Sequence, residues 1–129
     1  MRVYNKWHSI IKKELKKMNL THPQFVVLAS LAYLSQNGNE ITQIMISKLS
    51  GIDVMTVSQI LNLLEKNDFV KRKEHSKDTR AKAVTLNKKG EEILQKAVPL
   101  VEQIDEIFFE KLDTDEGQFK HFLVRLNEE

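Results

Sequence analysis

The hydrophobic period of the chain changes after residue 68, and this change restricts the possible folds more than any other feature. Before it, apolar side chains recur three or four positions apart, as they do on one face of an α-helix. Residues 69–73 and 82–86 instead have the pattern of two strands, which a polar loop joins. Helical spacing returns after residue 87. We therefore expect a mainly α fold with a small β-hairpin, and one domain over residues 1–129.

The composition excludes several classes of protein. Because cysteine is absent, the chain can form no disulfide, thiolate nucleophile or cysteine-based zinc finger. There is no H-x-x-x-H or H-E-x-x-H pair, no G-x-S-x-G elbow and no Gly-rich phosphate loop. No apolar run reaches about eighteen residues, and no signal peptide is recognisable. We expect a cytoplasmic protein that is no enzyme, lies in no membrane and has no metal or cofactor.

Charge is unevenly distributed along a chain whose net charge is only +2. Residues 71–90 carry eight Lys or Arg and two Asp or Glu, a net charge of +6, whereas residues 91–129 carry four and eleven, a net charge of −7. Such a concentration of positive charge indicates a polyanionic partner. A solvated charged hairpin without any partner is the alternative that charge alone leaves open.

Local signals place the first two helices. The first helix has an apolar stripe, and its members are Val3, Trp7, Ile10, Ile11, Leu15 and Met18. Thr21 then stands three residues before Gln24, with Pro23 between them, which predicts a capping box at the start of a second helix. Residues 25–34 are so apolar that this helix should lie at the centre of the core and end before residues 37–39.

Two short helices should follow in close succession. Thr42 can cap the first, and Gly51 stands where a left-handed residue would end it. Asp53 is the expected N-cap of the second, whose apolar stripe consists of Val57, Ile60, Leu61 and Leu64. The opposite face is polar and consists of Met55, Gln59, Asn62 and Lys66, with Thr56 and Ser58 at its flanks.

Two further helices complete the chain. Asn87 can cap a long helix with nearly heptad spacing at Ile93, Ala97, Leu100, Ile104, Ile107 and Leu112, a stripe that Val101 and Phe108 broaden. Pro99 should kink or break this helix because it removes a backbone hydrogen bond. Thr114 should cap a last helix, with Phe119, Phe122, Leu123 and Leu126 on one side.

This order of elements is that of a winged helix-turn-helix, and its chemistry suits double-stranded DNA. The second short helix would offer donors and acceptors to base edges in the major groove, and the basic hairpin would reach the backbone or the minor groove. Gln and Asn can pair with adenine, and Met55 can contact a thymine methyl group. The residues expected to read bases are Met55, Thr56, Ser58, Gln59 and Asn62.

The hairpin also resembles that of the MarR transcriptional regulators. Lys77-Asp78-Thr79-Arg80-Ala81 is similar to the D-x-R loop of that family, and Asn87 to Gly90 is similar to its T/N-x-x-G helix start. The resemblance implies that Arg80 enters a minor groove and that Asp78 orients it, as the potential of a narrow groove favours. We expect Arg72, Lys73 and Lys77 to neutralise phosphates.

The resemblance further implies a homodimer that binds a pseudo-palindromic operator, usually as a repressor. Residues 21–87 would form the winged helix-turn-helix, flanked by the dimerisation helices 1–20 and 88–129. The expected dimer contacts are Val3, Trp7, Leu100, Ile104, Ile107, Phe108, Phe119, Phe122 and Leu123. A helical core within one chain is the alternative for these residues. The absence of Lys and Arg between Val54 and Leu64 departs from many relatives and argues against a bidentate contact to guanine.

Many members of the family release DNA when a small aromatic or phenolic anion binds. Trp7, Ile11 and Phe25 are the candidates to line such a pocket, although residues at these spacings equally suit a plain core. Two other functions stay open beside sequence-specific regulation. One is a winged-helix module that binds a protein, and the other is an architectural protein that binds DNA without regard to sequence.

Overall fold

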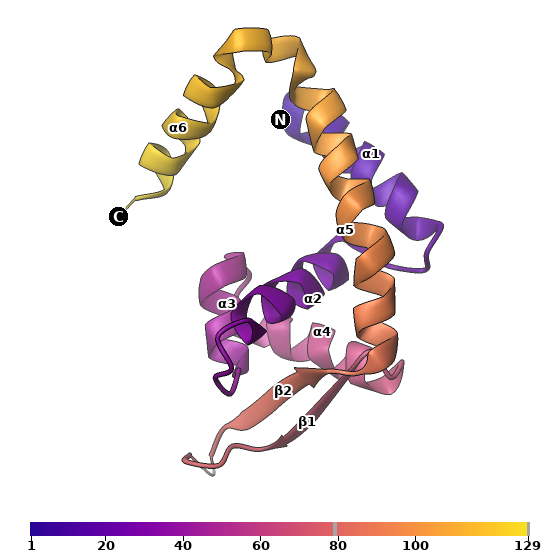
Figure 1. The fold of residues 1–129 in the computed structure, drawn as a ribbon, viewed down its shortest axis with the longest axis vertical. Coiled ribbons are helices and arrows are strands. Elements are labelled where there is room, and N and C mark those ends of the chain that lie inside the picture. Colours follow the sequence, from indigo (N-terminus) through magenta and orange to yellow (C-terminus); the bar gives the residue numbers. More distant parts are fainter. Residues whose placement is uncertain (79, 129) are drawn as a thin grey trace.

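The computed structural model describes residues 1–78 and 80–128, so that Thr79 of the D-x-R loop lies outside the described residues. The elements are α1 (Arg2–Lys16), α2 (His22–Ser35), α3 (Gln43–Ser50), α4 (Val54–Lys66), β1 (Val70–Glu74), β2 (Lys82–Leu86), α5 (Lys88–Phe109), the 3₁₀-helix η1 (Glu110–Asp115) and α6 (Glu116–Asn127). Helices α2 to α4 and the hairpin lie together at one end, and α5 rises from the hairpin toward α1 (Figure 1). The predicted mainly α fold with a β-hairpin is confirmed.

The helix starts follow the local signals of the sequence. Thr21 accepts a hydrogen bond from the backbone N–H of Gln24, and the Gln24 side chain accepts one from the backbone N–H of Thr21. Thr42 caps α3 and Asp53 caps α4 through the same kind of bond. Gly51 ends α3 with φ of 78°, a left-handed conformation that favours glycine. These caps satisfy backbone N–H groups that have no partner within their own helix.

The core lies where α1, α2, α4 and α5 meet. Ile11 and Leu15 of α1 are fully buried, as are Leu28 and Leu31 of α2. The predicted stripe of α4 is buried too, with Val57, Ile60, Leu61 and Leu64 all within the core. This stripe holds α4 against the other helices, so that the opposite face of α4 is left toward solvent.

The hairpin is an antiparallel pair in which Val70 is opposite Leu86 and Glu74 is opposite Lys82. Ile41 extends it by one bridge, since the Val84 N–H donates to the Ile41 carbonyl at 2.7 Å. The start of α5 packs tightly on the start of the hairpin. A Cβ atom at Gly90 would lie 2.3 Å from the carbonyl oxygen of Phe69, which explains the glycine of the Asn87-x-x-Gly90 motif.

Two expectations for α5 need correction. Asn87 is the N-cap residue but makes no side-chain capping bond, because its amide donates to the backbone carbonyl and to the carboxylate of Asp68. The break that was one of the two effects expected of Pro99 is absent, because the helix continues to Phe109, and the kink stays a prediction. Pro99 is exposed, so water can satisfy the carbonyl group that has lost its helical partner.

The end of the chain differs most from the prediction. Thr114 does not cap the last helix, because it lies inside η1, and the N-cap of α6 is Asp115. Asp113 of η1 has φ of 50°, so the chain turns there without an extended capping residue. The buried positions of α5 also include Leu94, which the heptad pattern omits, while Ile107 is 60% exposed.

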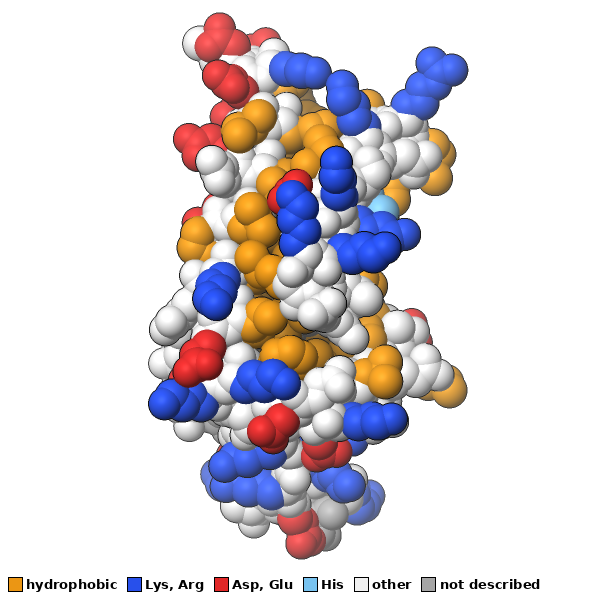
Figure 2. Space-filling model, turned by 90° about the vertical axis from the view of Figure 1, so that its right-hand side faces the viewer, with side chains coloured by type: hydrophobic (Ala, Val, Ile, Leu, Met, Phe, Trp, Pro, Cys, Tyr) orange, Lys and Arg blue, Asp and Glu red, His pale blue; other side chains and the backbone are white. Residues whose placement is uncertain are grey.

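A hydrophobic band and many basic side chains share one face of the molecule, with Lys and Arg side chains beside the band as well as at its lower end (Figure 2). Figure 2 shows a band of hydrophobic side chains along the face that carries α1 and α5, and a group of Lys and Arg side chains at the end where the hairpin lies. Among the described residues, no single helix is long and apolar enough to cross a membrane. Only α3 and α4 taken together have the required length and composition, and a bend of 115° separates them.

Candidate nucleic-acid interface

Helix α4 presents a polar face because its caps and its core stripe fix its rotation. The Asp53 carboxylate accepts hydrogen bonds from both the hydroxyl and the backbone N–H of Thr56, and these two bonds lower the pKa of Asp53. At about 100° per residue, Met55, Ser58, Gln59 and Asn62 share one side of the helix. Met55, Gln59 and Asn62 are exposed there and Ser58 is half-buried, so these four predicted base-reading residues lie together.

Thr56 differs from the other predicted base-reading residues. Its hydroxyl is engaged with Asp53, and its side chain is half-buried beside a cavity that Ile60 and Leu63 also line. Helical rotation places these three residues on one strip of α4, adjacent to the strip that carries Met55 and Gln59. Thr56 therefore lies on the cavity side of α4, where its hydroxyl donates to the N-cap residue Asp53.

Arg72 is not an exposed cation, contrary to the role in phosphate neutralisation expected for it. It lies in the middle of β1, and its side chain is only 13% exposed. Its Nη2 donates to Asn62 Oδ1 at 2.5 Å and to Glu65 Oε1 at 3.0 Å. The guanidinium lowers the pKa of the Glu65 carboxyl group. Arg72 thus links the hairpin to two residues of α4, one of which is a predicted base-reading residue.

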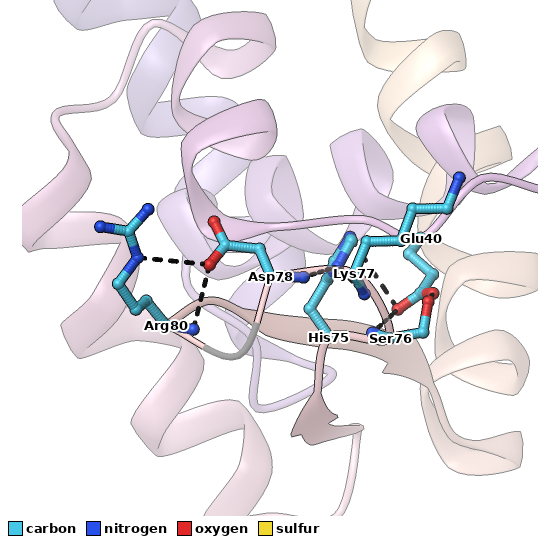
Figure 3. A network of polar contacts seen from close by, with 6 residues as sticks. All are labelled: Glu40, His75, Ser76, Lys77, Asp78 and Arg80. Atoms are coloured by element: carbon cyan, nitrogen blue, oxygen red, sulfur yellow. Dashed lines mark hydrogen bonds and ion pairs between the residues drawn. The ribbon is translucent and has the colours of Figure 1, made fainter.

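The tip of the hairpin brings Asp78 and Arg80 together. Oδ1 of Asp78 accepts hydrogen bonds from the backbone N–H of Arg80 at 3.1 Å and from its Nε at 3.5 Å (Figure 3). The Arg80 side chain is 92% exposed, so its remaining N–H groups face solvent. The expected pairing of these residues is therefore present in the structure, and the carboxylate holds the base of the guanidinium fork.

A polar network that the sequence does not reveal anchors the hairpin loop. Glu40, which follows α2, accepts hydrogen bonds from the backbone N–H and the hydroxyl of Ser76, and these bonds lower the pKa of Glu40. His75 Nε2 lies 3.9 Å from the Glu40 carboxylate, while His75 Nδ1 accepts from the backbone N–H groups of Lys77 and Asp78 (Figure 3). Because His75 Nδ1 accepts, its proton is on Nε2, which faces Glu40.

Donors dominate the surface between α3 and the hairpin. Lys73 and Lys77, which the sequence predicted to contact phosphates, are both exposed. A cavity of about 570 Å³ lies between the start of α3 and the hairpin, and three cations line it, Arg72, Arg80 and Lys82, against one carboxylate, that of Asp78. Helix α4, this cavity and the hairpin tip together offer hydrogen-bond donors and positive charge, which is the chemistry that phosphates and base acceptors need. No group of three His, Asp or Glu among the described residues could hold a metal ion.

The residues expected at a dimer interface fall into three groups. Val3, Ile107, Phe122 and Leu123 expose between 45% and 69% of their surface, although they are hydrophobic. Trp7, Leu100, Phe108 and Phe119 are half-buried. Ile104 is only 8% exposed because it packs into the core of its own chain. None of the residues of α6 is buried, so its apolar side chains are available for a partner.

The residues expected around an effector pocket lie elsewhere. Ile11 and Phe25 are buried in the core, and Trp7 donates a hydrogen bond from its indole Nε1 to Asp105. A cavity of about 810 Å³ does exist nearby, between α1, the start of α2 and α4. Its lining consists of Tyr4, His8, Lys12, Lys16, Asn19, Leu20, Thr21, His22, Pro23, Gln24, Thr56, Ile60 and Leu63. The plain core role that the spacing of Ile11 and Phe25 also suited is the one that these two residues have.

Comparison with known proteins agrees with this geometry. Residues 16–104 match the family described as "ArnR1-like, winged-helix domain". The uncharacterised HTH-type transcriptional regulator YdcH of Bacillus subtilis (strain 168) is 36% identical over 103 residues, which are 80% of this chain and 70% of that protein.

Solved structures share the fold over almost the whole chain. A MarR mutant from E. coli in complex with operator DNA superposes with a TM-score of 0.87 at 22% identity, covering 98% of this chain and 89% of that one. BpsR of Bordetella bronchiseptica, whose DNA binding is regulated by 6-hydroxynicotinic acid, superposes with a TM-score of 0.79 at 26% identity, covering 96% and 91%. The family to which the winged-helix match and the YdcH relative point consists of transcriptional regulators and not of enzymes. The chain belongs to the winged helix-turn-helix transcriptional regulators and has the fold of the MarR family.

Proposed function

We propose that this regulator acts in the cytoplasm as a homodimer that binds a pseudo-palindromic operator and represses transcription by occlusion. Each subunit places the exposed face of α4 in a major groove and Arg80 in the adjacent minor groove. The single observation that carries the proposal is the joint presentation of two donor groups. These are the polar face around Gln59 and the solvent-directed guanidinium of Arg80, which Asp78 holds by its Nε.

Electrostatics supports this docking. The negative potential of a narrow minor groove attracts an arginine, and the carboxylate of Asp78 reduces the freedom that Arg80 would lose on binding. Lys73 and Lys77 flank the tip and are exposed, so they can neutralise phosphates on either side. Glu40 and its bonds to Ser76 fix the loop relative to α2, which limits the ordering that the loop must undergo on DNA.

The proposed dimer uses residues 1–20 and 88–129, and residues 21–87 read DNA. Apolar side chains are exposed on α1, at the end of α5 and on α6. A second subunit that covered them would remove this surface from water, which is favourable by about 25 cal/mol per Å². A helix-turn-helix protein gains its second half-site, about one helical turn away, by pairing. Sedimentation velocity at micromolar concentration should give twice the mass of the chain; a monomer would contradict this part of the proposal.

The proposed effector is a small aromatic or phenolic anion, which binds in the cavity between α1, α2 and α4. Lys12 and Lys16 supply positive charge, none of the residues that line the cavity is acidic, and Tyr4 and Leu63 supply apolar surface. Because Thr56, Ile60 and Leu63 belong to α4, a ligand in this cavity would contact the helix that reads DNA. BpsR, which shares the fold, provides the precedent of regulation by such an anion.

The deciding experiment compares DNA sequences under identical conditions. Purified protein is titrated with duplex from upstream of its own gene and with random duplex of equal length, at several salt concentrations. A preference of about a thousandfold or more, with a steep salt slope, supports a specific regulator. Equal binding to both duplexes would favour an architectural DNA-binding protein, and absence of binding to either would favour a protein-interaction module.

A further inference from the structure

The contact between Arg72 and Asn62 affects which hydrogen-bonding groups α4 can offer to DNA bases. Nη2 of Arg72 lies 2.5 Å from Oδ1 of Asn62 and 3.0 Å from Oε1 of Glu65. The backbone N–H of Arg72 also donates to Oε2 of Glu65 at 3.2 Å. Asn62 and Glu65 are three residues apart on α4, so one arginine of β1 engages two neighbouring side chains of the recognition helix.

The chemistry of arginine dictates how the Asn62 amide is turned. A guanidinium group has only donors and stays protonated in proteins, so the atom that faces it must be the carbonyl oxygen of the amide. The NH₂ group of Asn62 is then on the side of the amide away from Arg72. Since Asn62 is exposed, this NH₂ group is the part of the side chain that is offered to a partner.

The fixed positive charge adds a second preference. An amino group of adenine or cytosine that approaches Asn62 Oδ1 would compete with a charged donor already bound at 2.5 Å. An oxygen or nitrogen acceptor would instead meet the Asn62 NH₂ group with a cation beside it. In the major groove, guanine presents two adjacent acceptors, whereas in an A·T pair the amino group of adenine stands between the acceptor of adenine and that of thymine.

We propose that Arg72 is a positioning residue that makes Asn62 a hydrogen-bond donor to DNA, so that Asn62 selects guanine, and with it a G·C pair, over an A·T pair. This inference rests on the proposed function, in which α4 enters the major groove. It replaces the adenine pairing that an isolated asparagine would favour. It also assigns Arg72 a role in specificity in place of a phosphate contact.

The test measures base preference with the full chain. Wild type and variants are used to select duplexes from a random-sequence library, and affinities are then measured for duplexes that carry each of the four base pairs at every operator position. Asn62→Ala identifies the base pair that depends on Asn62. Arg72→Met removes the donors while keeping the buried apolar stem, and Glu65→Gln removes the carboxylate that holds the guanidinium. Lys71→Ala is the matched control, because it removes an exposed cation from the same strand.

Wild type should favour a G·C pair over an A·T pair at the Asn62-dependent position by about ten-fold. Arg72→Met and Glu65→Gln should shift that preference toward an A·T pair and leave the other positions unchanged, while Lys71→Ala should weaken all duplexes alike. Preference for an A·T pair in wild type, or an unchanged preference in both variants, would overturn the inference. So would an Asn62→Ala protein that keeps every base preference, although specific binding would then still support the proposed function. A wild-type protein that selects no sequence would overturn both.

Discussion

The indole Nε1 of Trp7 donates a hydrogen bond to Oδ1 of Asp105 at 2.7 Å, and this bond joins α1 to α5 across 98 residues of sequence. Trp7 also packs against His22 at the start of α2, with 5.5 Å between ring centroids. The tryptophan therefore lies where α1 and α5 meet the start of α2, at the edge of the winged helix-turn-helix. Because the sequence has one tryptophan, its fluorescence reports on this junction directly.

Loss of the Trp7 bond should lower stability. Trp7→Phe keeps most of the aromatic surface but leaves the half-buried Asp105 carboxylate without its donor, so we expect the free energy of unfolding to fall by about 1–2 kcal/mol. Asp105→Asn is the matched control, because its carbonyl oxygen can still accept, and it should cost less. Urea unfolding followed by circular dichroism measures both, and a Trp7→Phe protein as stable as wild type would contradict the assignment.

Stability should also depend on pH through His22. Burial, followed by the nearby His8, lowers the pKa of His22 below its usual value of 6.5, although Asp105 opposes this. The unfolded chain therefore takes up a proton before the folded one does, so stability should be unaffected above pH 6.5 and should fall as the pH drops below it. His22→Gln should remove this fall below pH 6.5. An unchanged pH dependence in that variant would show that another group is responsible.

A second pH dependence should follow at lower pH. Hydrogen bonds lower the pKa of Asp53, Glu40 and Glu65, whose usual values are 3.8, 4.5 and 4.5. Their contribution is complete above these values and is lost as the pH falls further, because the unfolded carboxylates bind protons first. Thr56→Val should flatten the acid limb by removing one bond to Asp53. Denaturant midpoints between pH 5 and 2.5 provide the measurement, and equal acid limbs would contradict it.

The contact between Gly90 and Phe69 should make Gly90 intolerant of substitution. Gly90→Ala would put Cβ 2.3 Å from a backbone oxygen, so the start of α5 must move away from the hairpin, at a cost of about 1–3 kcal/mol or more. Gly117→Ala is the matched control, since no described atom beyond its chain neighbours and its own helix backbone lies within 4 Å of the added Cβ. It should leave stability unchanged or raise it by up to about 1 kcal/mol, because alanine favours helices. Similar melting temperatures for the two variants would refute the packing argument.

The sequence predicted the helix-turn-helix and the hairpin because their signals are local. Each cap at Thr21, Thr42 and Asp53 acts on a backbone group three residues away, and Gly51 supplies its own left-handed turn. The end of the chain was predicted less well, since the turn at Asp113 depends on a backbone conformation that aspartate adopts only occasionally.

The contacts of the hairpin show why the site was predicted only in part. Asp78 and Arg80 are two residues apart, so their pairing follows from a short motif. Glu40 and Ser76 are 36 residues apart, and no periodicity connects them. Arg72 appeared to be one more basic residue of the hairpin, because its contact with Asn62 depends on how β1 packs against α4, which residue type alone does not reveal.

Arg80 gives the most direct test of the account. Binding to the specific duplex is measured from about 50 to 200 mM salt for wild type, for Arg80→Ala and for Lys120→Ala, a control that removes an exposed cation from α6. Arg80→Ala should bind more weakly and lose about one unit of the slope of log affinity against log salt, while Lys120→Ala should match wild type. Wild-type affinity and slope in Arg80→Ala would contradict the claim that the hairpin tip binds DNA.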